Sequence, residues 1–369
     1  MRIIQVEPMI VEVPLKEPVT GVHGVTSVQK SLLVRVLSGD GVEGWGDVDP
    51  TPGYTLESID DIRADAERLA PALDGIDPFN IHRALAVMDE TLGGAFEAKA
   101  AIEMALLDLE GKALGVPVHV LLGGRLIDEV LLNAWIGAVP PEQAAREASD
   151  WLARGFTTAK IKISGPGGIG LDRVAAVRAA VGSQMALRVD FNESLAPNEA
   201  VPFIRALVPY DLTLVEQPVP RDRIDALAEI RRQITIPLMA DESVTSPASL
   251  IEIIKREAAD IVKVKAMKQG GLLRTRAMVE CAAAAGLRVV IGHGFGLALS
   301  TLAEATLAAT SAAVLPGCEA VGPLKMSADV VMEPLDLTHG ILKLPDTPGL
   351  GASIDPAALA RYRRKSGNE

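Results

Sequence analysis

Three acidic residues recur at a nearly constant interval in the second half of the chain, each near the end of a short apolar run. Asp190, Glu216 and Asp241 lie in MALRVDF, LTLVEQP and PLMADES, with separations of 26 and 25 residues. Lys162 precedes the first acid by 28 residues, and Lys265 follows the last by 24. A repeat of this length places each residue at an equivalent point of successive βα units. We therefore expect the three carboxylates to converge, with a lysine on either side.

Converging carboxylates favour a hard divalent cation. Sites made only of oxygen ligands select Mg²⁺ or Mn²⁺ rather than Zn²⁺. Without a cation three buried anions would repel one another strongly, so we expect Asp190, Glu216 and Asp241 to hold a metal ion. A substrate carboxylate could fill the remaining coordination positions. The alternative is an ion network in which the acids only form salt bridges with the neighbouring lysines.

Lys162 and Lys265 are expected on either side of the carboxylates, where they could transfer protons. A lysine beside a cation or a second lysine has a lowered pKa, because its charged form is disfavoured. With a pKa of about 7–8 it can act as a general base. Lys162 and Lys265, on opposite faces of the site, could remove a proton from one face of a carbon and return it to the other. The alternative for each one singly is an ordinary surface lysine that ends a strand.

From about residue 130, predicted strands and helices alternate along the chain and position these residues. Short apolar runs, which predict the strands, separate Ala- and Leu-rich segments, which predict the helices. This pattern is typical of parallel βα units. Eight strands are predicted, at 131–137, 157–163, 185–191, 212–218, 237–243, 260–266, 287–293 and near 315–321. Eight units favour a closed barrel over an open nucleotide-binding sheet, which usually carries a Gly-rich turn after its first strand. The sequence has no GxGxxG or P-loop motif, and SGPGGIG at 164–170 is interpreted as a turn before a helix.

The first 125 residues have a different, α+β pattern. Residues 2–14 alternate as in a strand, and SGDG at 38–41 predicts a hairpin between two further strands. Three helices are predicted after it, at 56–73, 81–91 and 98–113. LLGG at 121–124 marks a boundary, so we expect an α+β domain over residues 1–125 and a barrel over 126–334.

Composition excludes several classes of protein. The chain of 369 residues is 49% hydrophobic, which excludes a disordered chain, and its net charge of −12 argues against nucleic-acid binding. Two isolated cysteines do not form a disulfide framework. Glu7 and Glu12 interrupt any signal-peptide core, and the longest apolar stretches are far shorter than the roughly 20 residues of a membrane span. We expect a cytoplasmic protein.

The motifs around these residues resemble one known family. The sequence is similar to the muconate-lactonizing-enzyme subgroup of the mandelate racemase/muconate lactonizing enzyme family, in the enolase superfamily. The similarity covers essentially the whole chain. The matching segments are KIK (160–162), DFN (190–192), EQP (216–218), ADES (240–243), KAMKQGG (265–271), AIEMALLDLEGK followed by LLGG, CEAVGPL (318–324) and PGLG (348–351).

This resemblance implies a modified (β/α) TIM-type barrel with a capping α+β domain that the tail from about 335–369 completes. It implies Mg²⁺, or Mn²⁺, on the three acids and proton transfer next to a carboxylate through an enediolate, as is usual for enolase-superfamily sites. Lys162 and Lys265 would be the catalytic groups, and Lys160 would bind the substrate carboxylate. Asn192 is expected at the substrate. The supporting residues around the metal ligands would be Glu242 and Gln217.

Two segments depart from the subgroup or remain open. His293 lies in GHGFG, where muconate cycloisomerases usually carry a Met-Leu-Glu type segment. Mandelate racemases have a catalytic histidine there, but they pair it with an Asp where this chain has Lys265. We expect His293 to contact substrate, the alternative being a packed residue at the barrel mouth. Glu319 matches the acidic position of the eighth strand, whereas Val321 replaces the second Asp of dipeptide epimerases, which weakens the dipeptide interpretation.

Loops of the cap are expected to close over the barrel mouth and exclude water. His23, in the loop 19–27, and Tyr54, in the loop 47–58, would contact the substrate. Each residue taken singly is nearly as well explained as part of an ordinary surface turn.

The function predicted is a cycloisomerase or a racemase/epimerase acting on a small carboxylate, either muconate-like or an N-substituted amino acid. The alternatives are a hydroxy-acid or hydroxyproline-type dehydratase, a non-catalytic barrel that binds a small molecule, and a structural assembly protein. A homo-oligomer is expected, without nucleic-acid or membrane partners.

Overall fold

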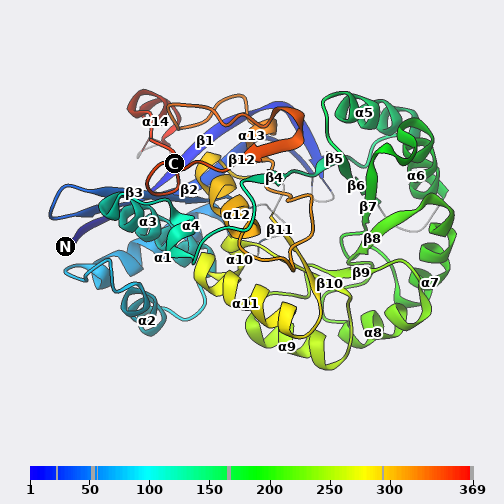
Figure 1. Ribbon diagram of the computed structural model, residues 1–369, viewed down its shortest axis with the longest axis horizontal. Coiled ribbons are helices and arrows are strands. Elements are labelled where there is room, and N and C mark those ends of the chain that lie inside the picture. Colours follow the sequence, from blue (N-terminus) through cyan, green and yellow to red (C-terminus); the bar gives the residue numbers. More distant parts are fainter. Residues whose placement is uncertain (22–23, 51–54, 56, 164–167, 293–294, 366–369) are drawn as a thin grey trace.

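The computed structural model describes residues 1–21, 24–50, 55, 57–163, 168–292 and 295–365. Figure 1 shows two parts: an N-terminal sheet with its helices on one side, and a ring of alternating strands and helices on the other. The C-terminus lies on the side of the N-terminal sheet (Figure 1).

The N-terminal sheet has three antiparallel strands in the order β1-β2-β3. Its strands are β1 (Ile3–Gly21), β2 (Gly24–Ser38) and β3 (Glu43–Val48). Apolar residues of β1 such as Val11 and Val13 are buried and alternate with polar ones, the pattern of a half-buried strand. Four helices follow: α1 (Ile59–Leu69), α2 (Ile81–Thr91), α3 (Phe96–Leu114) and α4 (Val118–Leu121). The first of these begins later than the sequence predicts, because Ser58 and Asp61 form a capping box.

The central helix of this part, α3, is buried along its whole middle, from Ala98 to Gly111. A helix that is covered all round belongs to a core. It crosses β3 closely at two glycines: a Cβ placed on Gly44 would lie 2.0 Å from the carbonyl oxygen of Ala105, and one on Gly46 would lie 2.4 Å from that of Ala101.

Gly46→Ala is therefore expected to destabilise the protein by about 1–3 kcal/mol, because the helix must move away from the strand. Urea denaturation followed by circular dichroism measures this. Gly93→Ala is the matched control, since a Cβ on Gly93 meets no atom within 4 Å. Equal midpoints for the two variants would contradict the close packing of α3 on β3.

The second part is a parallel sheet of seven strands in the order β11-β10-β9-β8-β7-β6-β5, each followed by a helical segment. The strands are β5 (Ala134–Ile136), β6 (Thr158–Lys162), β7 (Ala186–Asp190), β8 (Leu212–Glu216), β9 (Leu238–Ala240), β10 (Ile261–Val264) and β11 (Arg288–Ile291). The helices are α5 (Pro141–Ala153), α6 (Gly168–Val181), α7 (Pro197–Ala206), α8 (Ile224–Gln233), α9 (Pro247–Lys255), α10 (Ala266–Gln269), α11 (Leu272–Ala284) and α12 (Ala298–Ala308). Sequential βα units in one curled parallel sheet confirm the predicted barrel-type fold.

The eighth predicted strand is not a regular strand but an irregular closing segment. Leu315 donates a backbone hydrogen bond to Val289 of β11 at 2.8 Å, and Cys318 donates to Leu131, which precedes β5, also at 2.8 Å. The segment thus bridges the two edges of the sheet. A continuous ladder is prevented because Pro316 has no N–H and the glycine after it has a φ of 88°.

Carboxylates of the N-terminal part hold the first turns of two barrel helices. Asp47 accepts hydrogen bonds from the amide and the hydroxyl of Ser300 on α12, at 2.7 and 2.8 Å. Glu103 accepts from the amides of Leu272 and Leu273 on α11, at 2.7 and 2.8 Å. Free amides at a helix start favour such negative partners, so these contacts fix the two parts to each other.

The C-terminal segment returns to the N-terminal part. Strand β12 (Ile341–Lys343) pairs with β4 (Glu129–Leu131), and after α14 (Pro356–Tyr362) the amide of Arg364 donates to Ile10 of β1. Within the described ranges, no helix has the length and apolar composition needed to cross a lipid bilayer.

Candidate active site

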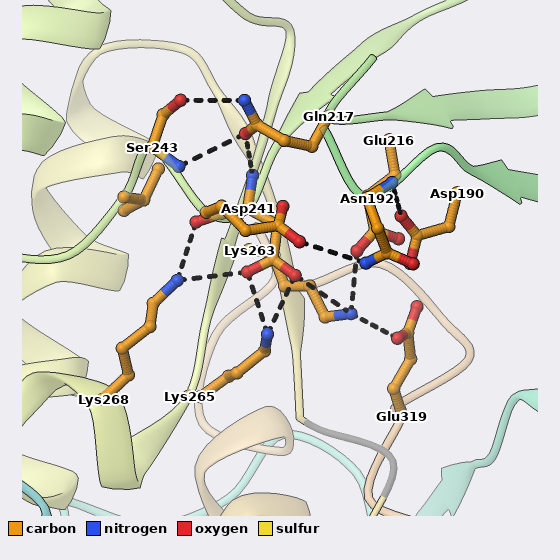
Figure 2. Close-up of polar contacts among 12 residues, drawn as sticks. Asp190, Asn192, Glu216, Gln217, Asp241, Ser243, Lys263, Lys265, Lys268 and Glu319 are labelled. Carbon is orange, nitrogen blue, oxygen red and sulfur yellow. Dashed lines mark hydrogen bonds and ion pairs between the residues drawn. The ribbon is translucent and has the colours of Figure 1, made fainter. Parts of the chain in front are cut away.

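Charged side chains from successive strands gather at the carboxyl ends of the sheet. They are Lys160 and Lys162 from β6, Arg188 and Asp190 from β7, Glu216 from β8, Asp241 directly after β9, Lys263 from β10, Lys265 directly after β10 and Glu319 from the closing segment. Parallel strands end at the same edge of a sheet, where side chains of neighbouring strands meet. Figure 2 shows the resulting network of ion pairs.

Glu216 lies at the centre of this network and is fully buried. Lys160 contacts one carboxylate oxygen at 3.2 Å, and Lys263 contacts the other at 3.1 Å. Burial and the neighbouring Asp190 carboxylate nevertheless raise the pKa of Glu216 well above its ordinary value. The anions therefore still repel one another, and a further cation would be favoured here.

Lys162 forms the open side of the site. Its ammonium contacts the carboxylate of Asp190 at 2.6 Å and donates to the side-chain oxygen of Asn192 at 2.7 Å. The side chain of Lys162 is 35% exposed, whereas that of Asp190 is buried. Burial raises the pKa of Asp190, but Lys162 and Lys160 outweigh it and hold this pKa below the ordinary value.

Lys265 approaches the acids from the opposite side. Its ammonium lies 2.8 and 2.9 Å from the two carboxylate oxygens of Asp241, and Lys268 reaches the same carboxylate at 3.1 Å (Figure 2). Burial, and then the neighbouring Lys268, hold the pKa of Lys265 well below its ordinary value. A buried lysine with a lowered pKa can accept a proton near neutral pH.

Glu319 joins the network from the closing segment. Lys160 contacts it at 2.5 Å, Lys263 also binds it, and Arg188 lies 3.4 Å away. Burial raises the pKa of Glu319, but these three cations outweigh burial and hold it well below the ordinary value. Glu319 is therefore an anion at neutral pH, and it holds Lys160 and Lys263 in place.

Amide and carboxyl side chains form hydrogen bonds around the acidic residues of the site. The side-chain oxygen of Gln217 accepts from the backbone amide of Asp241 at 3.0 Å, and its nitrogen donates to Ser243 at 2.9 Å (Figure 2). Asn192 donates to Glu242 at 3.0 Å, and burial followed by Asp241 raises the pKa of Glu242 to about 7. Gln217 and Asn192 have φ values of 35° and 44°, strained values that cluster at functional sites.

The structure brings together ten of the thirteen site residues predicted from the sequence. His23, Tyr54 and His293 lie outside the described residues. Sequence reasoning missed Lys263 and Arg188, although a signal existed. Each lies two residues before a predicted site residue within the same predicted strand, 185–191 or 260–266, and alternate residues of a strand share a face.

Lysines and an arginine of the chain itself surround the carboxylates, as in the ion-network alternative that the sequence left open. Within the part of the chain that the structure describes, no three acidic, histidine or cysteine side chains converge closely enough to hold a metal ion as they stand. The ammoniums of Lys160 and Lys263 lie between the carboxylates instead.

The donor set nevertheless suits a hard divalent cation. Three adjacent strands supply carboxylate oxygen alone, which Mg²⁺ and Mn²⁺ prefer. Burial and the Asp190 carboxylate both disfavour the ionised form of Glu216, and a bound cation would favour that form. Lys162, which is one-third exposed, has room to turn aside.

A cavity of about 600 Å³ lies at the other end of the sheet. Its lining residues include Arg231, Arg288 and Asp260, near the amino-terminal ends of β8 to β11. Arg231 is held by Asp260 at 2.7 Å, and Arg288 donates to the carbonyl of Ala313 at 3.0 Å. These groups already have partners, so the chemistry points to the carboxyl end.

Comparison with known proteins agrees with this geometry. A model described as the mandelate racemase/muconate lactonizing enzyme N-terminal domain matches residues 3–123, and one described as enolase C-terminal domain-like matches residues 143–358. The chain belongs to the mandelate racemase/muconate lactonizing enzyme family of the enolase superfamily. Enzymes of this family depend on a divalent metal.

Relatives in this family catalyse several isomerisations. The chain is 32% identical to muconate cycloisomerase 1 of Rhodococcus opacus, with 99% of each chain covered, and 32% identical to the N-succinyl-L-Arg/Lys racemase of Bacillus cereus, with 97% of each covered. The solved dipeptide epimerase of Enterococcus faecalis, complexed with Mg and the dipeptide L-Leu-L-Tyr, has a TM-score of 0.91 at 31% identity, covering 96% of this chain and 100% of that one. This family member is therefore an enzyme of isomerase type.

Proposed function

We propose that the protein is a Mg²⁺-dependent racemase or epimerase that moves a proton at the carbon next to a substrate carboxylate. An N-substituted amino acid is the substrate class that fits best. The relatives above include a cycloisomerase, a racemase and an epimerase at 31–32% identity, so identity alone does not separate these outcomes.

One observation carries the proposal: two lysines flank the carboxylates from opposite sides. Lys162 comes from β6 and reaches Asp190, whereas Lys265 follows β10 and reaches Asp241, with three strands between them. Inversion at a carbon needs a proton acceptor on one face and a proton donor on the other. Lys162 and Lys265 are placed to supply these two groups.

The remaining residues would bind and orient the substrate. Asp190, Glu216 and Asp241 would hold the metal ion, which when bound draws electron density from the substrate carboxylate and acidifies the neighbouring C–H. Lys160 would bind a carboxylate oxygen of the substrate. Glu242 and Gln217 would keep the metal ligands in place, as outer partners do at metal sites.

Hydrogen exchange in D₂O tests this function. The protein with MgCl₂ is incubated with N-succinyl-alanine, hydroxy acids and muconate, and proton NMR follows the α-proton signals. We expect exchange and inversion of N-succinyl-alanine that EDTA abolishes. Lactone formation from muconate without exchange would favour a cycloisomerase, and loss of water from hydroxy acids would favour a dehydratase. If the protein binds Mg²⁺ by calorimetry but none of the probes shows exchange or conversion, the proposal is contradicted.

A further inference from the structure

Arg173 is a buried arginine that the proposed reaction does not use. It belongs to α6, the helix that follows β6, and only 3% of the residue is exposed. An arginine keeps its charge in proteins, and a buried charged group needs hydrogen-bond partners. The groups that Arg173 contacts therefore indicate its role.

The guanidinium of Arg173 joins the chains that leave two neighbouring strands. Its Nε donates to the carbonyl of Val139, which follows β5, at 2.5 Å, and its Nη1 donates to the carbonyl of Lys162, the last residue of β6, at 2.8 Å. The last pair in the parallel register of these strands is Ile136 with Ile161. Both carbonyls lie beyond this pair, so the guanidinium continues the link between β5 and β6 where their ladder has ended.

The strand on the other side of β6 holds the same end. Lys162 is in register with Asp190 of β7, and the amide of Ile163 donates to the carbonyl of Asp190 at 2.9 Å. The helix α6 also packs closely here, because a Cβ placed on Gly170 would lie 2.7 Å from the side chain of Ile163. The backbone of Lys162 is thus held between β7 and Arg173.

The placement of this backbone matters because the side chain of Lys162 is long and 35% exposed. A misplacement of about 1 Å at a reacting group costs about 10²-fold in rate. Lys265 is supported by different groups: its amide donates to Gln269 at 2.7 Å, and the amide of Ala266 donates to Glu304 at 3.0 Å. Loss of the Arg173 guanidinium should therefore displace Lys162 and leave the support of Lys265 in place.

We propose that Arg173 is a positioning residue for Lys162. It holds the carboxyl end of β6 so that the Lys162 ammonium reaches its own face of the substrate carbon. This inference rests on the proposed function, in which Lys162 and Lys265 act on opposite faces of one carbon. It adds that each face has its own backbone support, so that one face can be impaired alone.

Initial rates of α-proton exchange test the two faces separately. Each enantiomer of N-succinyl-alanine is supplied at saturating concentration with MgCl₂ in D₂O, and proton NMR follows the α-proton. Lys162→Ala shows which enantiomer depends on Lys162. The test variants are Arg173→Met and Arg173→Lys, the second of which keeps the charge but not the planar fork.

Arg178→Met is the matched control. Arg178 lies on the same helix and donates to the carbonyls of Tyr210 and Met185, at 2.9 and 3.0 Å. These carbonyls lie just before β8 and β7, at the amino ends of the strands and away from the site. The control therefore loosens α6 without touching the end of β6, and urea unfolding compares the stabilities of all the variants.

Arg173→Met is expected to slow exchange of the Lys162-dependent enantiomer about 10–100-fold and to leave exchange of the other enantiomer close to that of the wild type. Arg173→Lys should shift the ratio of the two rates in the same direction, and it carries the same test should Arg173→Met not fold. Arg178→Met should leave the ratio unchanged, whatever its stability.

An equal loss for both enantiomers in the Arg173 variants, or no loss for either, would overturn the proposal and make Arg173 a residue of the fold alone. Failure of both variants to fold, or an equal shift of the ratio in Arg178→Met, would overturn it as well. These outcomes in an active wild type leave the proposed function intact, whereas a wild type that exchanges neither enantiomer would contradict the proposed function itself.

Discussion

Lys265→Ala is expected to stop the interconversion of the N-succinyl-alanine enantiomers while still exchanging the α-proton of one of them. The remaining Lys162 removes the proton from its own face, exchanges it with solvent and returns a deuteron to the same face. Lys162→Ala should do the same for the opposite enantiomer through Lys265. Chiral chromatography measures the interconversion, and proton NMR in D₂O measures the exchange.

The expected loss of interconversion is about 10²–10⁴-fold for either variant, the usual contribution of a positioned acid or base. Each variant loses exchange of a different enantiomer only if the two lysines act on opposite faces of the substrate carbon. This separation follows from their positions, since Lys162 contacts Asp190 and Lys265 contacts Asp241 from opposite ends of the acid row.

Lys30→Ala serves as the control, because Lys30 is an exposed lysine whose nearest acid, Glu12, is 3.9 Å away. It should retain both interconversion and exchange. If one active-site variant lost exchange of both enantiomers and the other variant lost neither, a single lysine would carry the proton transfer. That result would exclude the two-sided mechanism and favour cycloisomerisation.

The periodic part of the fold was predictable because one physical pattern repeats. Apolar runs that end in a charged residue recur every 24–28 residues. Each run indicates a strand that is buried along its length and places its last residue in the site. The five strands β6 to β10 follow this rule. The closing segment does not, since Pro316 interrupts it and its backbone bonds depend on edges that only the folded sheet provides.

The charge balance of the site could not be predicted from strand ends alone. Lys160 and Lys265 are both buried lysines, yet their pKa values move in opposite directions. Burial lowers both, but Glu216 and Glu319 outweigh it for Lys160 and raise its pKa. At Lys265 burial and Lys268 dominate and lower it. The difference depends on which carboxylate each ammonium reaches, and only the three-dimensional arrangement gives that.

Lys325 shows a second limit of the sequence. It follows the closing segment on a helix of four residues and belongs to no periodic pattern. Its ammonium lies 4.3 Å from the ring centre of Trp135 on β5 and 4.2 Å from that of Phe295, which follows β11. Nothing local to CEAVGPLK indicates that its last residue is buried between rings.

Lys263→Met is expected to destabilise the metal-free protein by about 3–5 kcal/mol. Lys263 is buried and contacts Glu216 at 3.1 Å and Asp241 at 3.7 Å, and it also binds Glu319. Removing one partner of a buried ion pair leaves the others without compensation, and this is the source of the large cost. Urea unfolding in EDTA measures it.

Added Mg²⁺ should recover much of this loss, because a cation bound by the same carboxylates takes over the charge that Lys263 supplied. Lys255→Met is the matched control: Lys255 pairs with Glu252 at 3.6 Å on the surface of α9, with 66% of its side chain exposed. Such exposed pairs contribute about 0.2–1 kcal/mol, so this variant should change little and respond to Mg²⁺ as the wild type does. If Lys263→Met in EDTA were as stable as Lys255→Met, Lys263 would not be the internal counter-ion of the carboxylates. If the variant were destabilised but gained no more from Mg²⁺ than the wild type, Lys263 and the metal ion would not share the same carboxylates.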